Sequence, residues 1–452
     1  MQAAEHKLSG APPHELSLCE AADAIARGEL TSEALVADCL NRVEARDSAV
    51  GAWAFLDREA ALANARNADR EQSRGPLHGV PIAAKDVVDT AAMPTCFGSP
   101  IYADHQPGSD AHCIRLLRDA GAVIVGKTVT AEFATYQPGP TANPLNVAHT
   151  PGGSSSGSAA AVADFQVPAA LGTQTAGSVV RPASYCGILG FKPTLGRYST
   201  TGVLDTAPNL DTLGMFVRCA ADALLLDSVL ADVPGGRGAE VTPQRVGLYR
   251  SPQWSAASLE MQQCLEQASR LLKAGGMAVE SVDLPRVYDD LADAQTLIHA
   301  RELADCLGEM LDLNSDKVSA ALIEFLSAGR GVTQTQYEDA LATMFLCRER
   351  FADDIDGLDV LLTPGATGVA PRGLEATGNP IFSRMWTALG TPCIGFPVAA
   401  GASGLPLGLQ LIGRPDDDSR LLRVVADIQN RISNWSISPP GEAAPAQLSK
   451  ES

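Results

Sequence analysis

Apolar and polar positions follow two alternating patterns along this chain. Apolar residues recur at helical spacing over 16–27, 31–46 and 58–70, which predicts amphipathic helices there. Short apolar runs typical of buried strands recur with helical stretches between many of them, at 52–56, 79–84, 122–125, 169–173, 187–192, 246–249, 360–363, 394–398 and 407–412. This succession predicts an α/β fold in which a mixed β-sheet is covered by helices on both faces.

Residues 150–194 stand apart because they hold more glycine, serine and alanine than an ordinary core element tolerates. Glycine permits tight turns and close approach of backbone N–H groups. Serine adds a hydroxyl that can attack a substrate or relay a proton. Ser154 and Ser178 lie in the two most glycine-rich pieces of the segment. We therefore place the candidate reaction site here.

A serine nucleophile needs a base, and this chain offers few candidates. His6 and His14 lie near the N-terminus, and the other histidines lie outside any glycine-rich context. Lysine can act as the base only where burial lowers its pKa, because desolvation disfavours the ammonium form. Lys85 directly follows the apolar run 80–84. From the residues alone it is either such a base or a strand-end lysine that reaches water.

Three separated motifs resemble the amidase signature family. They are Gly79-Val-Pro-Ile-Ala-Ala-Lys85-Asp86, Gly152-Gly153-Ser154-Ser155-Ser156-Gly157 and Gly172-Thr-Gln-Thr-Ala-Gly177-Ser178-Val-Val-Arg181-Pro182. The resemblance runs from about residue 16 to about residue 432 and implies a triad. In that triad Ser178 is the nucleophile, Ser154 is a bridging serine on a cis peptide bond, and Lys85 is the base.

The predicted catalytic residues come from widely separated parts of the chain and no linker or repeat interrupts its interior, so we expect one large α/β domain over residues 1–437. The section at about 261–352 is mostly helical by its pattern and matches the family least, so we expect it to line or cover the substrate pocket. The proline-containing stretch 438–452 is expected to be a disordered tail.

Backbone groups beside the predicted nucleophile are suited to bind a developing negative charge. Thr175, Ala176, Gly177 and Ser178 offer consecutive N–H groups in a turn that Gly177 allows to curl, which predicts an oxyanion hole. Each well-aimed donor lowers the barrier by roughly 3 kcal/mol. A plain glycine-containing turn is the alternative reading.

Arg181 is the predicted substrate-binding residue. The common sequence motif of the family has an aspartate at the position of Gln174 and an arginine at the position of Val180. In this chain the arginine comes one residue later, at Arg181. This wording is similar to that of malonamidase-type members, in which the arginine meets the carboxylate of the substrate, and which also suggest a dimer. A structural ion pair beneath the loop is the other possibility for Arg181.

Two further motifs match other catalytic patterns without their context. Residues 121–128 satisfy the P-loop pattern, but the interior Ala-Val-Ile-Val is itself the expected strand, so we predict no nucleotide binding. Residues 153–157 match a nucleophile elbow with Ser155 as the nucleophile. That fold requires a later histidine, and only His299 is available, in a helix-like stretch.

We also expect no metal and no other cofactor. His105 and His112 could be imagined as metal ligands, as could the acidic run 416–418, which we expect instead to cap a helix over 419–428. The ten cysteines form no C-x-x-C pair, and Cys186 is read as a small core residue.

Charge and composition limit which binding partners and which cellular location we expect for this protein. The formal net charge is −19, from 34 basic and 53 acidic residues, which disfavours nucleic acids and anionic membranes as partners. No secretion signal opens the sequence, no apolar run approaches a membrane span, and free thiols are expected. These features predict a cytoplasmic protein.

Together the residues and the resemblance predict an amidase. It would hydrolyse the C–N bond of a small linear amide, with a carboxylate-bearing amide as one option, through an acyl-enzyme intermediate, as a homodimer. One alternative is the glutaminase (A-type) subunit of a tRNA-dependent amidotransferase, which requires protein partners. A further alternative is a non-catalytic binding protein on an amidase scaffold.

Overall fold

The computed structural model describes residues 11–231 and 245–440, and its strands in these ranges form one eleven-stranded sheet. The strand order is β1-β3-β2-β4-β6-β5-β10-β11-β9-β7-β8. β2 runs parallel to β3 and β4, β7 runs parallel to β8 and β9, and the remaining neighbours are antiparallel. The strands are β1 (Trp53–Leu56), β2 (Pro81–Lys85), β3 (Val123–Thr128), β4 (Ala169–Gln174), β5 (Leu189–Lys192), β6 (Thr212–Val217), β7 (Arg245–Tyr249), β8 (Ala278–Val282), β9 (Val360–Pro364), β10 (Cys393–Ala400) and β11 (Pro406–Ile412).

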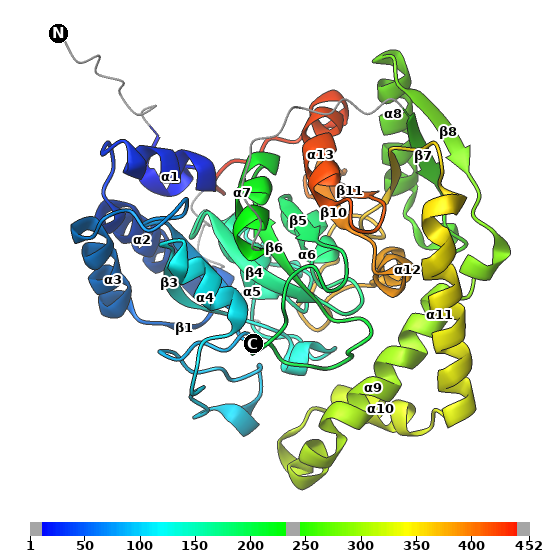
Figure 1. Ribbon diagram of the computed structural model, residues 1–452, viewed down its shortest axis with the longest axis horizontal. Coiled ribbons are helices and arrows are strands. Elements are labelled where there is room, and N and C mark those ends of the chain that lie inside the picture. Colours follow the sequence, from blue (N-terminus) through cyan, green and yellow to red (C-terminus); the bar gives the residue numbers. More distant parts are fainter. Residues whose placement is uncertain (1–10, 232–244, 441–452) are drawn as a thin grey trace, which may run out of the picture.

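Helices lie on both faces of this sheet, so the predicted fold class is confirmed (Figure 1). They are α1 (Leu18–Ala26), α2 (Ser32–Val50), α3 (Arg58–Arg70), α4 (His112–Asp119), α5 (Ser156–Ala163), α6 (Val180–Cys186), α7 (Ala220–Leu230), α8 (Leu259–Ala274), α9 (Leu291–Leu313), α10 (Ala320–Arg330), α11 (Gln334–Asp354), α12 (Ile381–Leu389) and α13 (Asp418–Ile432). In Figure 1, α9, α10 and α11 extend away from the sheet at the lower right.

Side chains alternate between the two faces along each strand. In β2, Ile82 and Ala84 join the core cluster that includes α4, α7, α8 and α13. Ala83 joins the cluster that includes α2, α3 and α5. β3 divides in the same way, with Ile124 in the first cluster and Val125 in the second. Burial on both faces explains why these strands read as nearly continuous apolar runs in the sequence.

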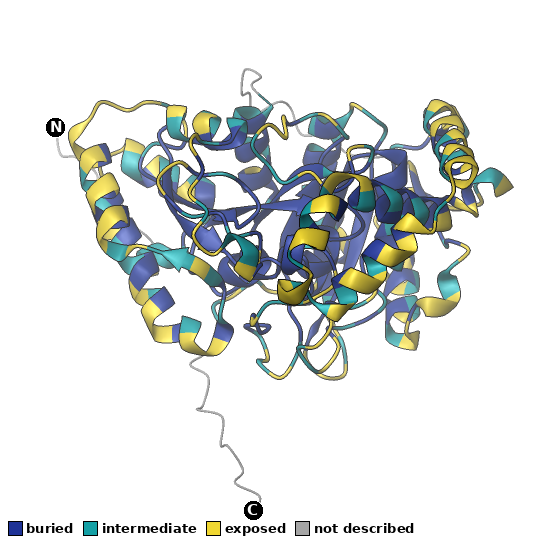
Figure 2. Cartoon of the chain, turned by 90° about the horizontal axis from the view of Figure 1, so that it is seen from below, coloured by how far each residue is buried: buried dark blue, intermediate teal, exposed yellow. Residues whose placement is uncertain are grey.

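The helices α5 and α6 are buried at every residue. α5 packs on β4 and on α6, and α6 packs on β5, β10 and β11. Figure 2 shows the contrast between this interior and the outer helices, which carry exposed stripes. A Cβ atom at Gly157 would lie 2.2 Å from the carbonyl oxygen of Ala52 and 2.4 Å from the nitrogen of Val129. Close packing therefore accounts for part of the small-residue composition of segment 150–194.

Two strands are absent from the sequence prediction. β8 is an edge strand with exposed polar residues such as Glu280, so it leaves no apolar run, and it lies in a section that the pattern predicts as mostly helical. β6 is central, but Gly214 interrupts its pattern. A Cβ atom there would lie 2.6 Å from the carbonyl oxygen of Phe191, so the close approach of β5 requires glycine.

Residues 416–418 lie at the N-terminus of α13 as expected, with Asp417 at the N-cap and Asp418 in the first turn, but the capping hydrogen bond is absent. Asp418 is buried and accepts hydrogen bonds from the backbone N–H (2.8 Å) and the hydroxyl (2.6 Å) of Thr194. The carboxylate thus ties α13 to the loop after β5, a partner 224 residues away that local sequence rules cannot reveal.

The structure describes only the first residues of the expected C-terminal tail. Of the tail expected at 438–452, residues 438–440 are described, and the carbonyl of Pro440 accepts a hydrogen bond of 2.8 Å from Arg42. Residues 441–452 lie outside the described residues. Within 11–231 and 245–440, no helix combines the length and the apolar character needed to span a membrane.

Candidate active site

The candidate site lies at the carboxyl ends of β2 and β4, two neighbouring parallel strands. Lys85 is the last residue of β2, and Thr173 is near the end of β4. The turn that carries Ser178 follows β4 directly and leads into α6. Adjacent parallel strands end at the same edge of a sheet, so residues 88 positions apart along the chain meet here.

Lys85 is fully buried and has two hydroxyl partners. Its Nζ donates to Oγ of Ser154 at 2.8 Å and to Oγ1 of Thr173 at 2.7 Å. Burial lowers the pKa of Lys85 to about 7, while the charge of Asp211 acts in the opposite direction. The side chain does not reach water, so the reading of Lys85 as an exposed strand-end lysine is wrong. A buried lysine with this pKa can lose its proton near neutral pH.

The serine segments meet through a backbone contact. The peptide bond between Gly153 and Ser154 is cis, as the resemblance implies. Arg181, in the first turn of α6, donates from Nη2 to the carbonyl oxygen of Gly153 at 2.6 Å. This contact holds the start of α6, three residues after Ser178, against the residue that precedes Ser154.

Ser178 lies 7% exposed in the turn before α6. Its hydroxyl has no hydrogen-bond partner among residues 11–231 and 245–440. The backbone N–H groups of Thr175, Ala176, Gly177 and Ser178 likewise donate to no group in the described part of the chain. Free donors grouped beside a free hydroxyl are the arrangement that an oxyanion hole needs.

Gly177 does not have the conformational role expected from the sequence. Its φ angle lies outside the left-handed region. Glycine suits this position instead because of close contact with the start of α12, where an added Cβ would lie 3.0 Å from Cβ of Pro380 and 3.2 Å from Cβ of Ser383. The small residue thus lets a neighbouring helix close against the turn, which sequence spacing alone cannot show.

Two residues absent from the sequence prediction, the half-buried Asp211 and the buried Gln295, hold the turn that carries Ser178. Asp211, just before β6, accepts the hydroxyl of Thr175 and the N–H groups of Thr206 (2.7 Å) and Ala207 (2.8 Å). Gln295 on α9 donates from Nε2 to the carbonyl oxygen of Thr175 at 2.9 Å. Burial raises the pKa of Asp211, and its hydrogen bonds oppose that shift. Neither residue lies in a recognisable motif, so the sequence holds no signal for them.

Gln174 caps the turn rather than facing a substrate. Its Oε1 accepts from the N–H groups of Val179 (2.9 Å) and Val180 (3.0 Å), and its Nε2 donates to Oγ1 of Thr387 at 3.0 Å. Thr387 also donates to the carbonyl oxygen of Ala176 at 2.8 Å. Because both polar atoms of the Gln174 side chain are engaged inside the protein, this residue shapes the turn.

Arg181 is a buried cation with unpaired nitrogens. It is 4% exposed, and Nη2 donates to Gly153 and, at 3.0 Å, to Oγ1 of Thr377. Nε and Nη1 are buried and have no partner in the described part of the chain. Burial lowers the pKa of Arg181 to about 10, so the guanidinium is charged at neutral pH. No carboxylate of the described residues forms an ion pair with it, so the ion-pair alternative for Arg181 is wrong.

The residues of the two other motifs have structural partners. Lys127, at the lysine position of the P-loop pattern, lies in β3 and forms a buried ion pair of 3.3 Å with Asp86. Ser155 is fully buried, where its hydroxyl donates to the carbonyl of Thr173 (3.2 Å) and accepts from the N–H of the same residue (3.3 Å). His299 lies in α9, as its helix-like context indicates.

Residues 11–231 and 245–440 contain no group of three or more His, Cys, Asp or Glu side chains placed to hold a metal ion. Cys186 lies in the core, where burial raises its pKa and its thiol donates to the carbonyl of Pro151. Its environment is that of a packing residue rather than a reactive thiolate.

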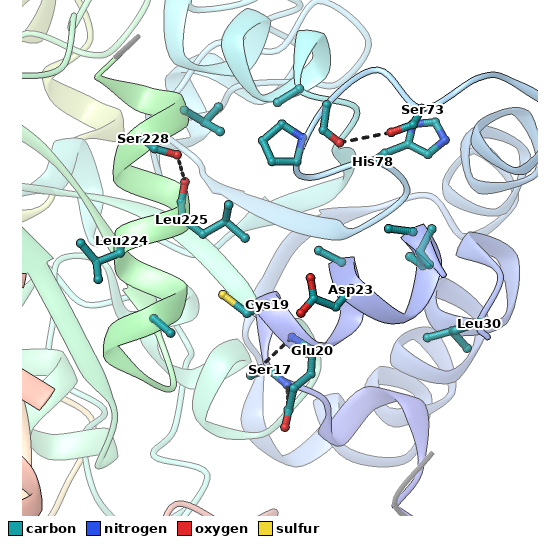
Figure 3. A pocket seen from close by; sticks show the side chains of 18 of the residues that line it. Ser17, Cys19, Glu20, Asp23, Leu30, Ser73, His78, Leu224, Leu225 and Ser228 are labelled. Carbon is teal, nitrogen blue, oxygen red and sulfur yellow. Dashed lines mark hydrogen bonds between the residues drawn. The ribbon is translucent and has the colours of Figure 1, made fainter. Parts of the chain in front are cut away.

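One cavity borders the site, and a larger one lies apart from it. A cavity of about 260 Å³ is lined by Thr173, the second partner of Lys85, and by Thr175 and Asp211. A groove of about 1480 Å³ lies between α1, α7 and the end of α3 (Figure 3). None of the predicted site residues lines that groove, so its size does not make it the candidate site.

The pKa of Lys85 predicts how activity depends on pH. Only the neutral amine can accept a proton, so kcat/KM is expected to rise with pH along a limb centred near 7. Asp211→Asn removes the charge that raises the pKa of Lys85 and should move the limb to lower pH. The measurement is kcat/KM against pH for both proteins. A limb near 10.4, the ordinary value for lysine, would contradict the burial argument.

Comparison with known proteins identifies the family. Residues 34–422 match the family described as Amidase, so the chain belongs to the amidase family and is an amidohydrolase. The A-type subunit of glutamyl-tRNA(Gln) amidotransferase from Chloroflexus aggregans is 33% identical, covering 94% of this chain and 98% of the relative. A solved amidase structure superposes with a TM-score of 0.86 at 30% identity, covering 92% of this chain and 100% of that one. The native peptide amidase from Stenotrophomonas maltophilia gives 0.81 at 28% identity, covering 96% and 100%.

Proposed function

We propose that this amidohydrolase uses Lys85, Ser154 and Ser178 to hydrolyse a small amide that carries a carboxylate. The observation that supports the triad best is the 2.8 Å contact between Nζ of Lys85 and Oγ of Ser154 inside the protein. A hydroxyl bound to a lysine of lowered pKa can pass a proton in either direction. No metal or other cofactor is needed for this chemistry.

The first half of the reaction forms an acyl-enzyme. Neutral Lys85 takes the proton of the Ser154 hydroxyl, and Ser154 takes the proton of Ser178 as its Oγ attacks the amide carbon. The carbonyl oxygen becomes an oxyanion, which the free N–H groups of 175–178 stabilise. The C–N bond then breaks, and the nitrogen receives the proton back through Ser154 and leaves as ammonia or an amine.

The second half releases the acid. Water enters the acyl-enzyme and loses a proton to the same Ser154–Lys85 relay while its oxygen attacks the ester carbon. The Ser178–carbon bond breaks, Ser178 regains its proton, and the carboxylic acid leaves. Thr173 keeps Nζ of Lys85 beside Ser154 throughout, because it provides the second hydroxyl contact.

Arg181 supports the carboxylate on the substrate. A buried guanidinium without a carboxylate partner is costly, and a bound anion removes most of that cost. Nε and Nη1 hold three of the five guanidinium N–H groups, and all three lack a partner in the described part of the chain. A carboxylate on the acyl group would fill this position, as it does in the malonamidase-type members that the local wording resembles.

A second candidate function follows from the relatives. The A-type subunit of a glutamyl-tRNA(Gln) amidotransferase is similar over 94% of the chain. On that reading the chain is a glutaminase that supplies ammonia to partner proteins rather than a free-standing hydrolase. A homodimer and a cytoplasmic location stay predictions of the first reading.

Ammonia release by the purified chain distinguishes the two functions. We expect the chain alone to release ammonia from succinamate faster than from neutral butyramide, and to release little from glutamine. Butyramide is the matched control because its acyl chain has the same length. Glutaminase activity that appears only after partner proteins are added would contradict the free hydrolase and favour the amidotransferase reading.

A further inference from the structure

Arg181 is not the only cation beside the nucleophile turn that lacks a carboxylate partner. Arg384, on α12, donates from Nη1 to Oε1 of Gln295 (2.7 Å) and to the hydroxyl of Thr296, and from Nη2 to the hydroxyl of Tyr136 at 3.4 Å. All of these partners are neutral. No described carboxylate lies within ion-pair distance of Arg384. Its positive charge therefore has no counterpart inside the described protein.

His299 adds two more unpaired polar atoms. It lies one turn after Gln295 on α9, so both side chains leave the same face of the helix. It is 4% exposed, and both ring nitrogens are buried with no hydrogen-bond partner in the described part of the chain. Burial, and after it the charge of Arg384, lower the pKa of His299 to about 3. The ring is therefore neutral and offers one donor and one acceptor.

A chain of contacts runs from His299 through Phe325, Tyr136, Arg384 and Gln295 to the turn that carries Ser178. The ring of Phe325 meets the rings of His299 and Tyr136 edge-on, each with 4.9 Å between centroids. Tyr136 meets Arg384, and Arg384 meets Gln295, which is bound to the turn at Thr175. The backbone N–H of Arg181 donates to the carbonyl oxygen of Gly177 at 3.1 Å, and Gly177 packs against Ser383, the residue before Arg384, so both arginines flank the turn that carries Ser178.

We propose that Arg384 and His299 form a second polar subsite, which binds an additional carboxylate on the substrate, distinct from the one at Arg181. The inference rests on the proposed amidase function and deepens it. Two nearby cations without acidic partners repel each other, and one bound carboxylate balances only one of them. An acyl group with two carboxylates balances both and supplies acceptors to the unpaired nitrogens. The substrate class is thus a primary amide of a tricarboxylic acid.

The test compares two amides that differ by one carboxylate. Succinamate carries one, and the terminal monoamide of propane-1,2,3-tricarboxylate carries two. We expect the wild-type chain to have the higher kcat/KM for the second amide. Arg384→Gln and His299→Phe should each lower the ratio of the two kcat/KM values by about 10- to 100-fold, the effect of losing a hydrogen bond to a charged group. Arg384→Lys should keep part of the ratio.

The ratio separates the subsite from a general disturbance of the turn, because a loosened turn slows both amides together. Arg348→Gln is the matched control: it removes the same charge from a guanidinium that donates to the carbonyls of Ala388 and Asn209, and it should leave the ratio unchanged. A wild-type ratio of one or below, or variants of Arg384 and His299 that leave it unchanged, would overturn the proposal.

A binding measurement separates failure of the proposed second subsite from failure of the proposed amidase function. If the wild-type chain hydrolyses no amide, the proposed function is wrong, and binding still tests the subsite. Propane-1,2,3-tricarboxylate should raise the melting temperature more than succinate at equal concentration, and Arg384→Gln should remove that difference. Equal stabilisation of the wild-type chain by the two acids would overturn the second subsite whatever the activity.

Discussion

Replacing Ser178 or Lys85 by alanine is expected to lower kcat by about 10⁴-fold or more, because each change removes the nucleophile or its base. Ser154→Ala is expected to keep somewhat more activity, since the oxyanion donors stay in place. The measurement is steady-state hydrolysis of succinamate, with circular dichroism as a check on folding.

Ser155→Ala is the matched control for these variants. Ser155 is the neighbouring serine, and its hydroxyl is bound to the backbone of Thr173 rather than to Lys85. Its replacement should cost far less activity. A fluorophosphonate should label Ser178 and leave Ser155 unmodified. Near-normal turnover in the Ser178 or Lys85 variant, or labelling at Ser155, would rule out the proposed triad.

Arg181→Lys is expected to remove the preference for carboxylate-bearing amides. The ratio of kcat/KM for succinamate over butyramide should fall by about 30- to 1000-fold, equivalent to roughly 2–4 kcal/mol for a buried charged contact. Turnover of butyramide should fall as well, because Nη2 of Arg181 also holds the carbonyl of Gly153 next to Ser154. The ratio, and not either rate alone, reports carboxylate recognition.

A second buried arginine provides the control for this substitution. Arg218 is 6% exposed and donates to the carbonyls of Val167 and Leu16. Arg218→Lys makes the same chemical change and should leave the succinamate-to-butyramide ratio intact even if it lowers stability. Equal losses on both amides in Arg181→Lys would mean that Arg181 only supports the fold.

The central residues of the site could be predicted because they lie in short, contiguous sequence motifs. The motifs around Lys85, Ser154 and Ser178 are each contiguous in the sequence: Lys85 ends β2, Ser154 lies just before α5, and Ser178 lies between β4 and α6. The resemblance also implies the cis peptide bond before Ser154, which the structure has. The free N–H groups of 175–178 agree with the predicted oxyanion hole, whose catalytic role stays a prediction.

Other residues of the site carry no local signal. Asp211 before β6, Gln295 on α9 and Thr387 on α12 hold the turn that carries Ser178, and no motif in the adjacent sequence marks any of them. From the sequence, Gln174 was only a departure from the common motif of the family. The structure shows that its side chain accepts from the first N–H groups of α6.

By itself, the sequence determined the α/β class, most of the strands, and the residue types at the centre of the site. Those features follow from periodicity and from short motifs, which act over a few neighbouring residues. Only the tertiary structure decided that Lys85 loses contact with water, and that Arg181 and His299 are buried with nitrogens that have no partner in the described part of the chain. Burial and charge balance depend on residues that are distant in the chain and adjacent in space, so they exist only once the sheet and its helices have assembled.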